Sequence, residues 1–170
     1  MPTPVNSRSS INGFSTIGKT GLIAGSLDIT AACLQYYIRT GNGPGNVLRY
    51  VASGVFGRKA FTGGIPMACW GLFFHYLIAF GFTLFFFLIY PATRLVSKST
   101  VITGMLYGVF AWAVMNLLVI PMSYIKPKPV FDAGKGLAAM LILMFCIGLP
   151  ISILISRYYA KKNMGGLFSK

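Results

Sequence analysis

Two carboxylate side chains occur in the 170 residues, and one of them, Asp28, lies in an apolar stretch. This stretch runs from Gly21 to Ile38 and is otherwise suited to lipid. A charged side chain at the centre of a bilayer costs about 2.5–3.5 kcal/mol on insertion scales. Asp28 is therefore a candidate proton carrier, cation ligand or substrate counter-ion.

Two further polar side chains are predicted at the depth of Asp28. With a helical rise of about 1.5 Å per residue, Asp28 lies roughly 15 Å from the end of its segment. His75, the only histidine, and Asn116 lie roughly 14 Å from the same face of the membrane. We expect Asp28 and His75 to face each other in an intramembrane Asp-His centre, with Asn116 at the same level.

Gln35 and Cys146 complete the set of candidate ion-binding, substrate-binding or proton-relay residues. Gln35 shares one helical face with Asp28, and Cys146 lies near mid-depth, where Pro150 removes the N–H that its carbonyl would accept. Small residues let helices approach closely in lipid. A stripe of small residues on each of the first two spans marks the face that we expect to point inward. The stripes are Gly21, Gly25 and Ala32 in the first span, and Ala68, Gly71 and Ala79 beside His75 in the second.

These polar residues allow two interpretations. Asp28, His75 and Asn116 could serve only to hold helices together by hydrogen bonds, or Asp28 could have a functional role. A single histidine without a second strong ligand does not indicate haem or metal binding, so we expect no cofactor and no metal. The sequence shows no nucleophile–base set or phosphate loop, and we therefore do not expect an enzyme.

The elements that position these residues follow from the apolar segments. The chain is 55% hydrophobic and 10% charged, with a mean hydropathy of +0.71. This composition predicts an all-α integral membrane protein with one four-helix transmembrane domain over residues 19–160. We predict spans at about 21–38, 65–90, 101–125 and 133–159, a flexible N-terminal tail over 1–18 and a basic C-terminal tail over 161–170. The aromatic run from Phe85 to Phe87 is expected to face lipid.

A short amphipathic helix at about 46–57 is predicted between the first and second spans. It is too short to cross a membrane, so we expect it to lie in the interface; a re-entrant hairpin is the alternative. The net charge of +13 comes from basic residues at the ends of apolar runs, which favours lipid phosphates over nucleic acid. The expected headgroup contacts are Arg39, Arg49, Arg58 and Lys59.

The sequence also bears on the connection before the fourth span and on the orientation of the chain in the membrane. Residues 126–130 contain two prolines and should be extended, and Asp132 is expected to cap the fourth span. Four spans place both termini on one side, and the fifteen basic residues divide eight to seven between the two sides. We expect cytoplasmic termini because of Lys161 and Lys162, although the near balance also permits an antiparallel homodimer.

Three stretches carry a resemblance to known proteins. Gly21 to Asp28, Ala52 to Gly57 and Gly71 to His75 together resemble YagU-like proteins, small bacterial inner-membrane proteins without an assigned function. The resemblance implies a bacterial inner membrane and brings no catalytic residue with it.

Two functions from different classes remain open. The first is a small proton- or cation-coupled transporter or channel-like protein, similar in layout to small four-helix multidrug exporters with one acid in the first span. The second is a non-catalytic accessory or assembly subunit of a larger membrane complex. Both predict membrane lipids as partners and either a homo-oligomer or a larger protein complex.

Overall fold

The computed structural model describes residues 7–96, 99–125 and 133–167. Four of its helical stretches are long and apolar enough to cross a membrane, namely Gly13–Thr40, Gly64–Thr93, Thr100–Met122 and Gly136–Lys162. A short helix lies between the first two, as the sequence predicts. The chain is therefore a multi-pass helical membrane protein, and the predicted fold class is confirmed.

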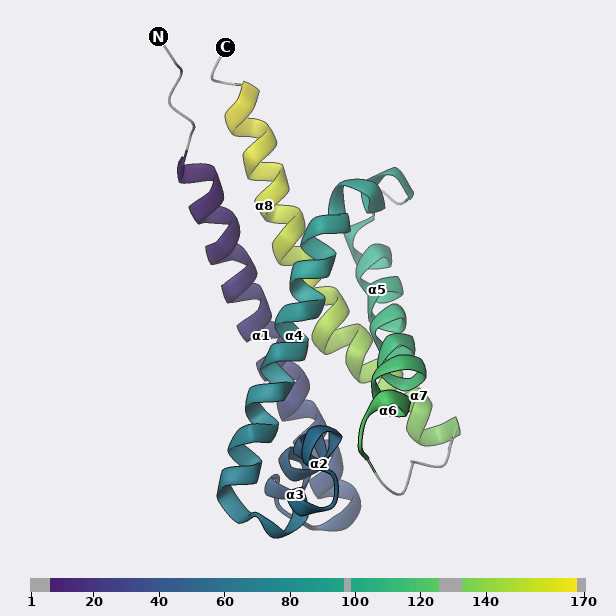
Figure 1. Cartoon of the computed structure of the whole chain (residues 1–170). Coiled ribbons are helices and arrows are strands. Elements are labelled where there is room, and N and C mark those ends of the chain that lie inside the picture. Colours follow the sequence, from purple (N-terminus) through teal and green to yellow (C-terminus); the bar gives the residue numbers. More distant parts are fainter. Residues whose placement is uncertain (1–6, 97–98, 126–132, 168–170) are drawn as a thin grey trace.

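Ten helical elements make up the described residues (Figure 1). Two of them, η1 and η2, are single turns of π-helix that interrupt the third and fourth spans. In chain order the elements are α1 (Ser7–Thr40), α2 (Gly45–Phe56), α3 (Lys59–Thr62), α4 (Gly64–Val96), α5 (Thr100–Val114), η1 (Met115–Val119), α6 (Ile120–Met122), α7 (Ala133–Leu143), η2 (Met144–Gly148) and α8 (Leu149–Leu167).

The start of α1 and the end of α8 lie at one end of the bundle, and α2 and α3 lie at the other (Figure 1). The helices extend further than predicted at both termini. Helix α1 begins at Ser7 and α8 continues to Leu167, so residues 7–18 and 161–167 are helical rather than parts of tails. Both extensions continue an existing helix, which needs no new nucleation step. The predicted extended linker and the Asp132 cap lie outside the described residues.

The core of the bundle is formed by α1, α4, α5, η2 and α8. Phe86, Ile151 and Ile155 are fully buried. The Tyr107 hydroxyl donates a 2.6 Å hydrogen bond to the carbonyl of Phe82, which joins α5 to α4. Phe86 was expected to face lipid with the rest of its aromatic run, but it is buried. The reason is that α5 packs beside α4, so only the remaining side of α4 faces lipid.

Three glycines bring α5 against η2 and α8 with almost no separation. A Cβ added at Gly104 would lie 2.9 Å from the Gly148 carbonyl oxygen, and one added at Gly108 would lie 2.9 Å from the Leu143 carbonyl oxygen. Next to this contact the Ser152 hydroxyl donates a 2.7 Å hydrogen bond to the Thr100 carbonyl. We call this contact between Gly104, Gly108 and Gly148 the glycine crossing.

Helix α2 packs on the first half of α4. A Cβ at Gly71 would collide with the backbone of Leu48, and Phe56 lies 5.9 Å from Trp70 and 6.0 Å from Phe74 between ring centroids. Gly71 therefore faces α2, and not α1 as its place in the small-residue stripe suggested. The stripe is shared between two neighbours because the short helix covers one end of α4.

Candidate functional site

The Asp28 carboxylate lies where three helical elements meet. Asp28 is half-buried on α1, and its charge interacts with His75 on α4 and with Cys146 on η2. Helix α1 approaches α4 closely in this region, since a Cβ at Gly25 would lie 3.0 Å from the Tyr76 ring and 3.1 Å from the Ala79 Cβ. The predicted inward face of the first span is thus confirmed.

The His75 imidazole bonds to backbone and not to the carboxylate. Its Nε2 lies 2.8 Å from the Gly25 carbonyl oxygen. A carbonyl can only accept, so Nε2 carries the hydrogen and donates. Within the described residues, Asp28 makes no ion pair with His75 and no side-chain hydrogen bond.

The expectation of a buried Asp-His centre is therefore wrong. Both side chains are half-buried, and the imidazole already donates to the carbonyl of Gly25, one helical turn before Asp28. The physical reason is Gly25, which has no side chain to shield its carbonyl from the neighbouring helix. The sequence places the two residues on adjacent helices at matching depth, but it does not determine which acceptor the imidazole selects.

Asn116 does not join Asp28 and His75. Its side chain is exposed, and its Nδ2 donates a 2.9 Å hydrogen bond to the Trp112 carbonyl of its own helix. The buried face of α5 ends at Ala111, and the position five residues later is rotated well away from it. The Trp112 Nε1–H nearby is buried without a hydrogen-bond partner among the described residues.

Gln35 and Cys146 are half-buried, and only Cys146 interacts with Asp28. Cys146 lies inside η2, a feature that our sequence analysis missed although π-turns often occur at functional sites. The signal was proline, since Pro150 follows η2 by two residues just as Pro121 follows η1. Proline has no N–H for the preceding turn, so the local helical bonding pattern must change there.

The described part of the chain holds no group of three His, Cys, Asp or Glu side chains placed to bind a metal ion. The polar level around Asp28 thus offers one carboxylate, one imidazole whose Nε2 is engaged, and one thiol. These groups could bind a proton or accept hydrogen bonds from another chain.

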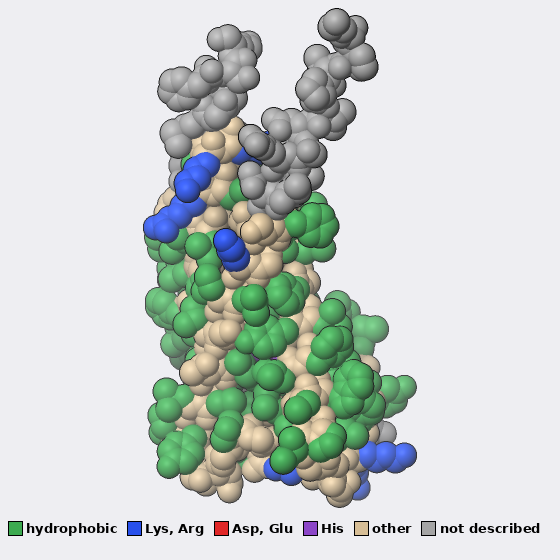
Figure 2. Space-filling model, turned by 90° about the vertical axis from the view of Figure 1, so that its left-hand side faces the viewer, with side chains coloured by type: hydrophobic (Ala, Val, Ile, Leu, Met, Phe, Trp, Pro, Cys, Tyr) green, Lys and Arg blue, Asp and Glu red, His purple; other side chains and the backbone are tan. Residues whose placement is uncertain are grey.

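Basic side chains lie at the ends of the bundle, and hydrophobic ones lie between them (Figure 2). At the end formed by α2 and α3, Arg39, Arg58 and Lys59 are exposed. Arg49 differs because its guanidinium bonds to the Gly45 carbonyl at 3.2 Å and to Asn46 Oδ1 at 2.9 Å. This arrangement suits headgroup contact by the three exposed residues better than by Arg49.

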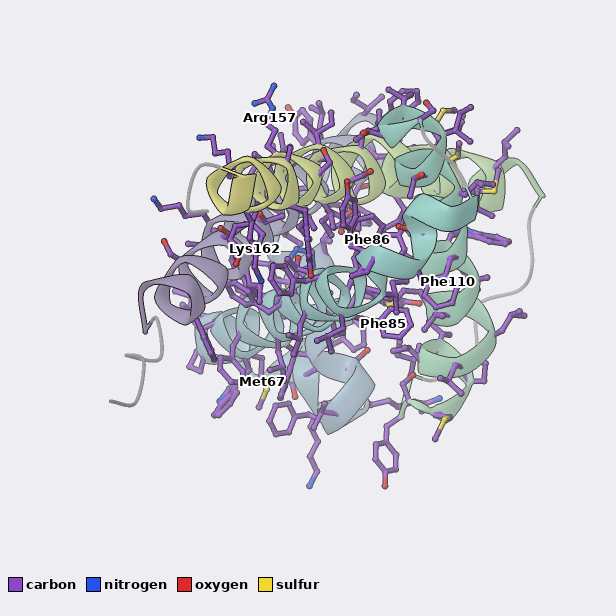
Figure 3. The ribbon with its side chains drawn as sticks, turned by 90° about the horizontal axis from the view of Figure 1, so that it is seen from above. Met67, Phe85, Phe86, Phe110, Arg157 and Lys162 are labelled. Atoms are coloured by element: carbon purple, nitrogen blue, oxygen red, sulfur yellow. The ribbon has the colours of Figure 1, made fainter. Side chains whose placement is uncertain are left out.

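Two of the surface grooves lie at contacts between helices. One, of about 300 Å³, lies between α4 and α5, where the Phe85 and Phe110 rings stack with centroids 5.6 Å apart (Figure 3). The other, of about 240 Å³, lies at the α2–α3 turn beside Tyr124. Neither is lined by Asp28, His75 or Asn116.

Comparison of the chain with protein-family models, with curated proteins and with solved structures finds no match. The resemblance to YagU-like proteins therefore stays a prediction. Any function must be argued from the arrangement of the residues themselves.

Proposed function

We propose that this protein is a non-enzymatic subunit of a larger membrane assembly. The observation that carries the proposal is that two polar side chains inside the spans, Asp28 and Asn116, make no hydrogen bond to another helix within the described residues. Asp28 makes no hydrogen bond or ion pair within the described residues, and Asn116 bonds only to its own helix. Neither side chain lines the groove between α4 and α5 or the groove at the α2–α3 turn.

Polar side chains at this depth normally pair with other groups or line a cavity, since the hydrocarbon of lipid has no group that can form a hydrogen bond with them. In the core of the bundle, two hydroxyls meet this requirement within the chain. The hydroxyls of Tyr107 and Ser152 are buried and donate to carbonyls of other helices. A second membrane-spanning chain with donors facing Asp28 and Asn116 would supply partners for these two side chains.

The test is the size of the particle extracted in a mild detergent and measured by native mass spectrometry. We expect the wild-type chain of 18.5 kDa to appear in a larger stoichiometric complex. Asp28→Leu combined with Asn116→Leu should release the monomer. Thr83→Val is the matched control, because Thr83 is also an in-membrane polar residue but is buried and bonds to Ala79 of its own helix.

A monomeric wild-type particle would contradict the proposal. So would a double variant that assembles as well as the wild type. The partner can be another copy or a different chain, and the measured mass distinguishes these two cases.

A second candidate is a proton- or cation-coupled transporter in which Asp28 alone binds the ion. It is supported by the position of the half-buried Asp28 carboxylate on α1, which packs against both α4 and η2. In proteoliposomes, a pH gradient should drive ion movement through the wild type and not through Asp28→Asn. Equal flux through both would count against this candidate.

We also propose a bacterial inner membrane with both termini cytoplasmic. The resemblance to YagU-like proteins supports the bacterial inner membrane, and the Lys161–Lys162 pair supports the orientation. A fluorescent protein fused to the C-terminus should then fluoresce, whereas alkaline phosphatase fused there should be inactive. The reverse pattern would contradict the orientation.

A further inference from the structure

The lining of the groove at the α2–α3 turn combines one positively charged side chain with apolar side chains. The lining residues are Val55, Phe56, Gly57, Arg58 and Tyr124. The backbone N–H of Tyr124 donates a 2.9 Å hydrogen bond to the Gly54 carbonyl, which fixes the end of the third span against α2. The groove is thus built by two segments far apart in the sequence, at the end of the bundle where a membrane span stops.

Arg58 is available to a ligand at this groove. Its side chain is exposed and makes no hydrogen bond or ion pair within the described residues, and the exposed Lys59 follows it. Asp28 is the only acid in the described part of the chain, and it lies inside a span. Arg49 on α2 is instead bonded to Gly45 and Asn46. The guanidinium of Arg58 therefore has no anion beside it within the described residues.

The walls of the groove indicate what kind of anion fits. Val55 is 50% exposed and Tyr124 is 69% exposed, so both present apolar surface next to the charge. A free phosphate ion would leave this surface in water. A phospholipid would place its phosphate on Arg58 and its glycerol and upper acyl carbons on Val55 and Tyr124.

We propose that this groove is a binding site for one anionic phospholipid, with its phosphate at Arg58. The inference does not depend on the proposed assembly role, because it uses a different end of the molecule and different residues. Each basic side chain near an anionic headgroup contributes about 1 kcal/mol, which corresponds to roughly a fivefold change in binding.

The experiment uses the full chain in mild detergent with an equimolar mixture of phosphatidylglycerol and phosphatidylethanolamine of identical acyl chains. Native mass spectrometry counts the lipids retained per chain. We expect one phosphatidylglycerol on the wild type, about fivefold less on Arg58→Gln, and wild-type retention on Arg157→Gln. Arg157 is the matched control, since it is exposed on α8 and does not line the groove.

Tyr124→Ala tests the apolar wall, because it keeps the backbone bond to Gly54 but removes the ring, and it should also reduce lipid retention. Thermal unfolding of each variant shows whether the fold is intact. Equal retention by the wild type and Arg58→Gln, or an equal loss on Arg157→Gln, would overturn the proposal. Displacement of the lipid by millimolar inorganic phosphate would overturn it as well, because it would assign the groove to a free anion.

Discussion

The glycine crossing and the level around Asp28 both bring helices into close contact through glycine, but they differ in what the contact leaves unsatisfied. At the glycine crossing, backbone meets backbone, and the hydroxyl of Ser152 donates to the neighbouring helix. Around Asp28, Gly25 has no side chain, so the His75 imidazole can reach and bond to the Gly25 carbonyl. The carboxylate has no hydrogen-bonding partner within the described residues. The first region contributes stability within one chain, and the second is where the proposed assembly would supply the missing partner.

The largest expected effect is that of overpacking the glycine crossing. Gly148→Ala would place a methyl group against the Gly104 carbonyl oxygen and 2.8 Å from the Gly108 nitrogen. Because these are backbone atoms, the helices must separate, at a cost of about 3 kcal/mol. We expect a large drop in Tm in detergent.

Gly81→Ala is the matched control for this substitution. Gly81 lies in α4 with no atom within 4 Å of an added Cβ, so its replacement should be neutral or stabilising by up to about 1 kcal/mol. Similar Tm values for the two variants would show that the glycine crossing is not tightly packed.

An intermediate effect of opposite sign is expected at Asp28. Asp28→Leu removes a polar group that has no hydrogen-bonding partner within the described residues, so the isolated monomer should gain up to about 2.5 kcal/mol. The measurement is the unfolding of purified monomer in detergent. A lower stability of the variant would mean that the carboxylate does hold helices of the same chain together, which would remove the contrast between the two regions.

The smallest effects concern single hydrogen bonds between helices. Tyr107→Phe removes the bond to Phe82, and His75→Leu removes the bond to Gly25. Hydrogen bonds between helices in membranes average about 0.6 kcal/mol, so each variant should lose about that much stability. A loss at His75 several times larger than that at Tyr107 would indicate that the imidazole does more than bond to a carbonyl.

The candidate residues divide into those whose positions the sequence predicted and those whose contacts it did not. Helical period and small-residue spacing correctly placed Gly25 and Asp28 on the side of α1 that meets its neighbours. The same reasoning did not separate Gly71, which packs on α2, from Ala79, which packs on α1. Periodicity gives the direction of a side chain around its own helix, but not the identity of the neighbour on that side.

The sequence by itself determined the four spans, the short helix after the first one and the common depth of Asp28 and His75. These follow from length, hydropathy and helical rise, which are properties of each segment alone. Only the tertiary structure decided that His75 bonds to Gly25, that Asn116 is exposed and that Phe86 is buried while Phe85 is not. Those outcomes depend on how each helix is rotated against the others, and that rotation is set by packing between residues distant in the sequence.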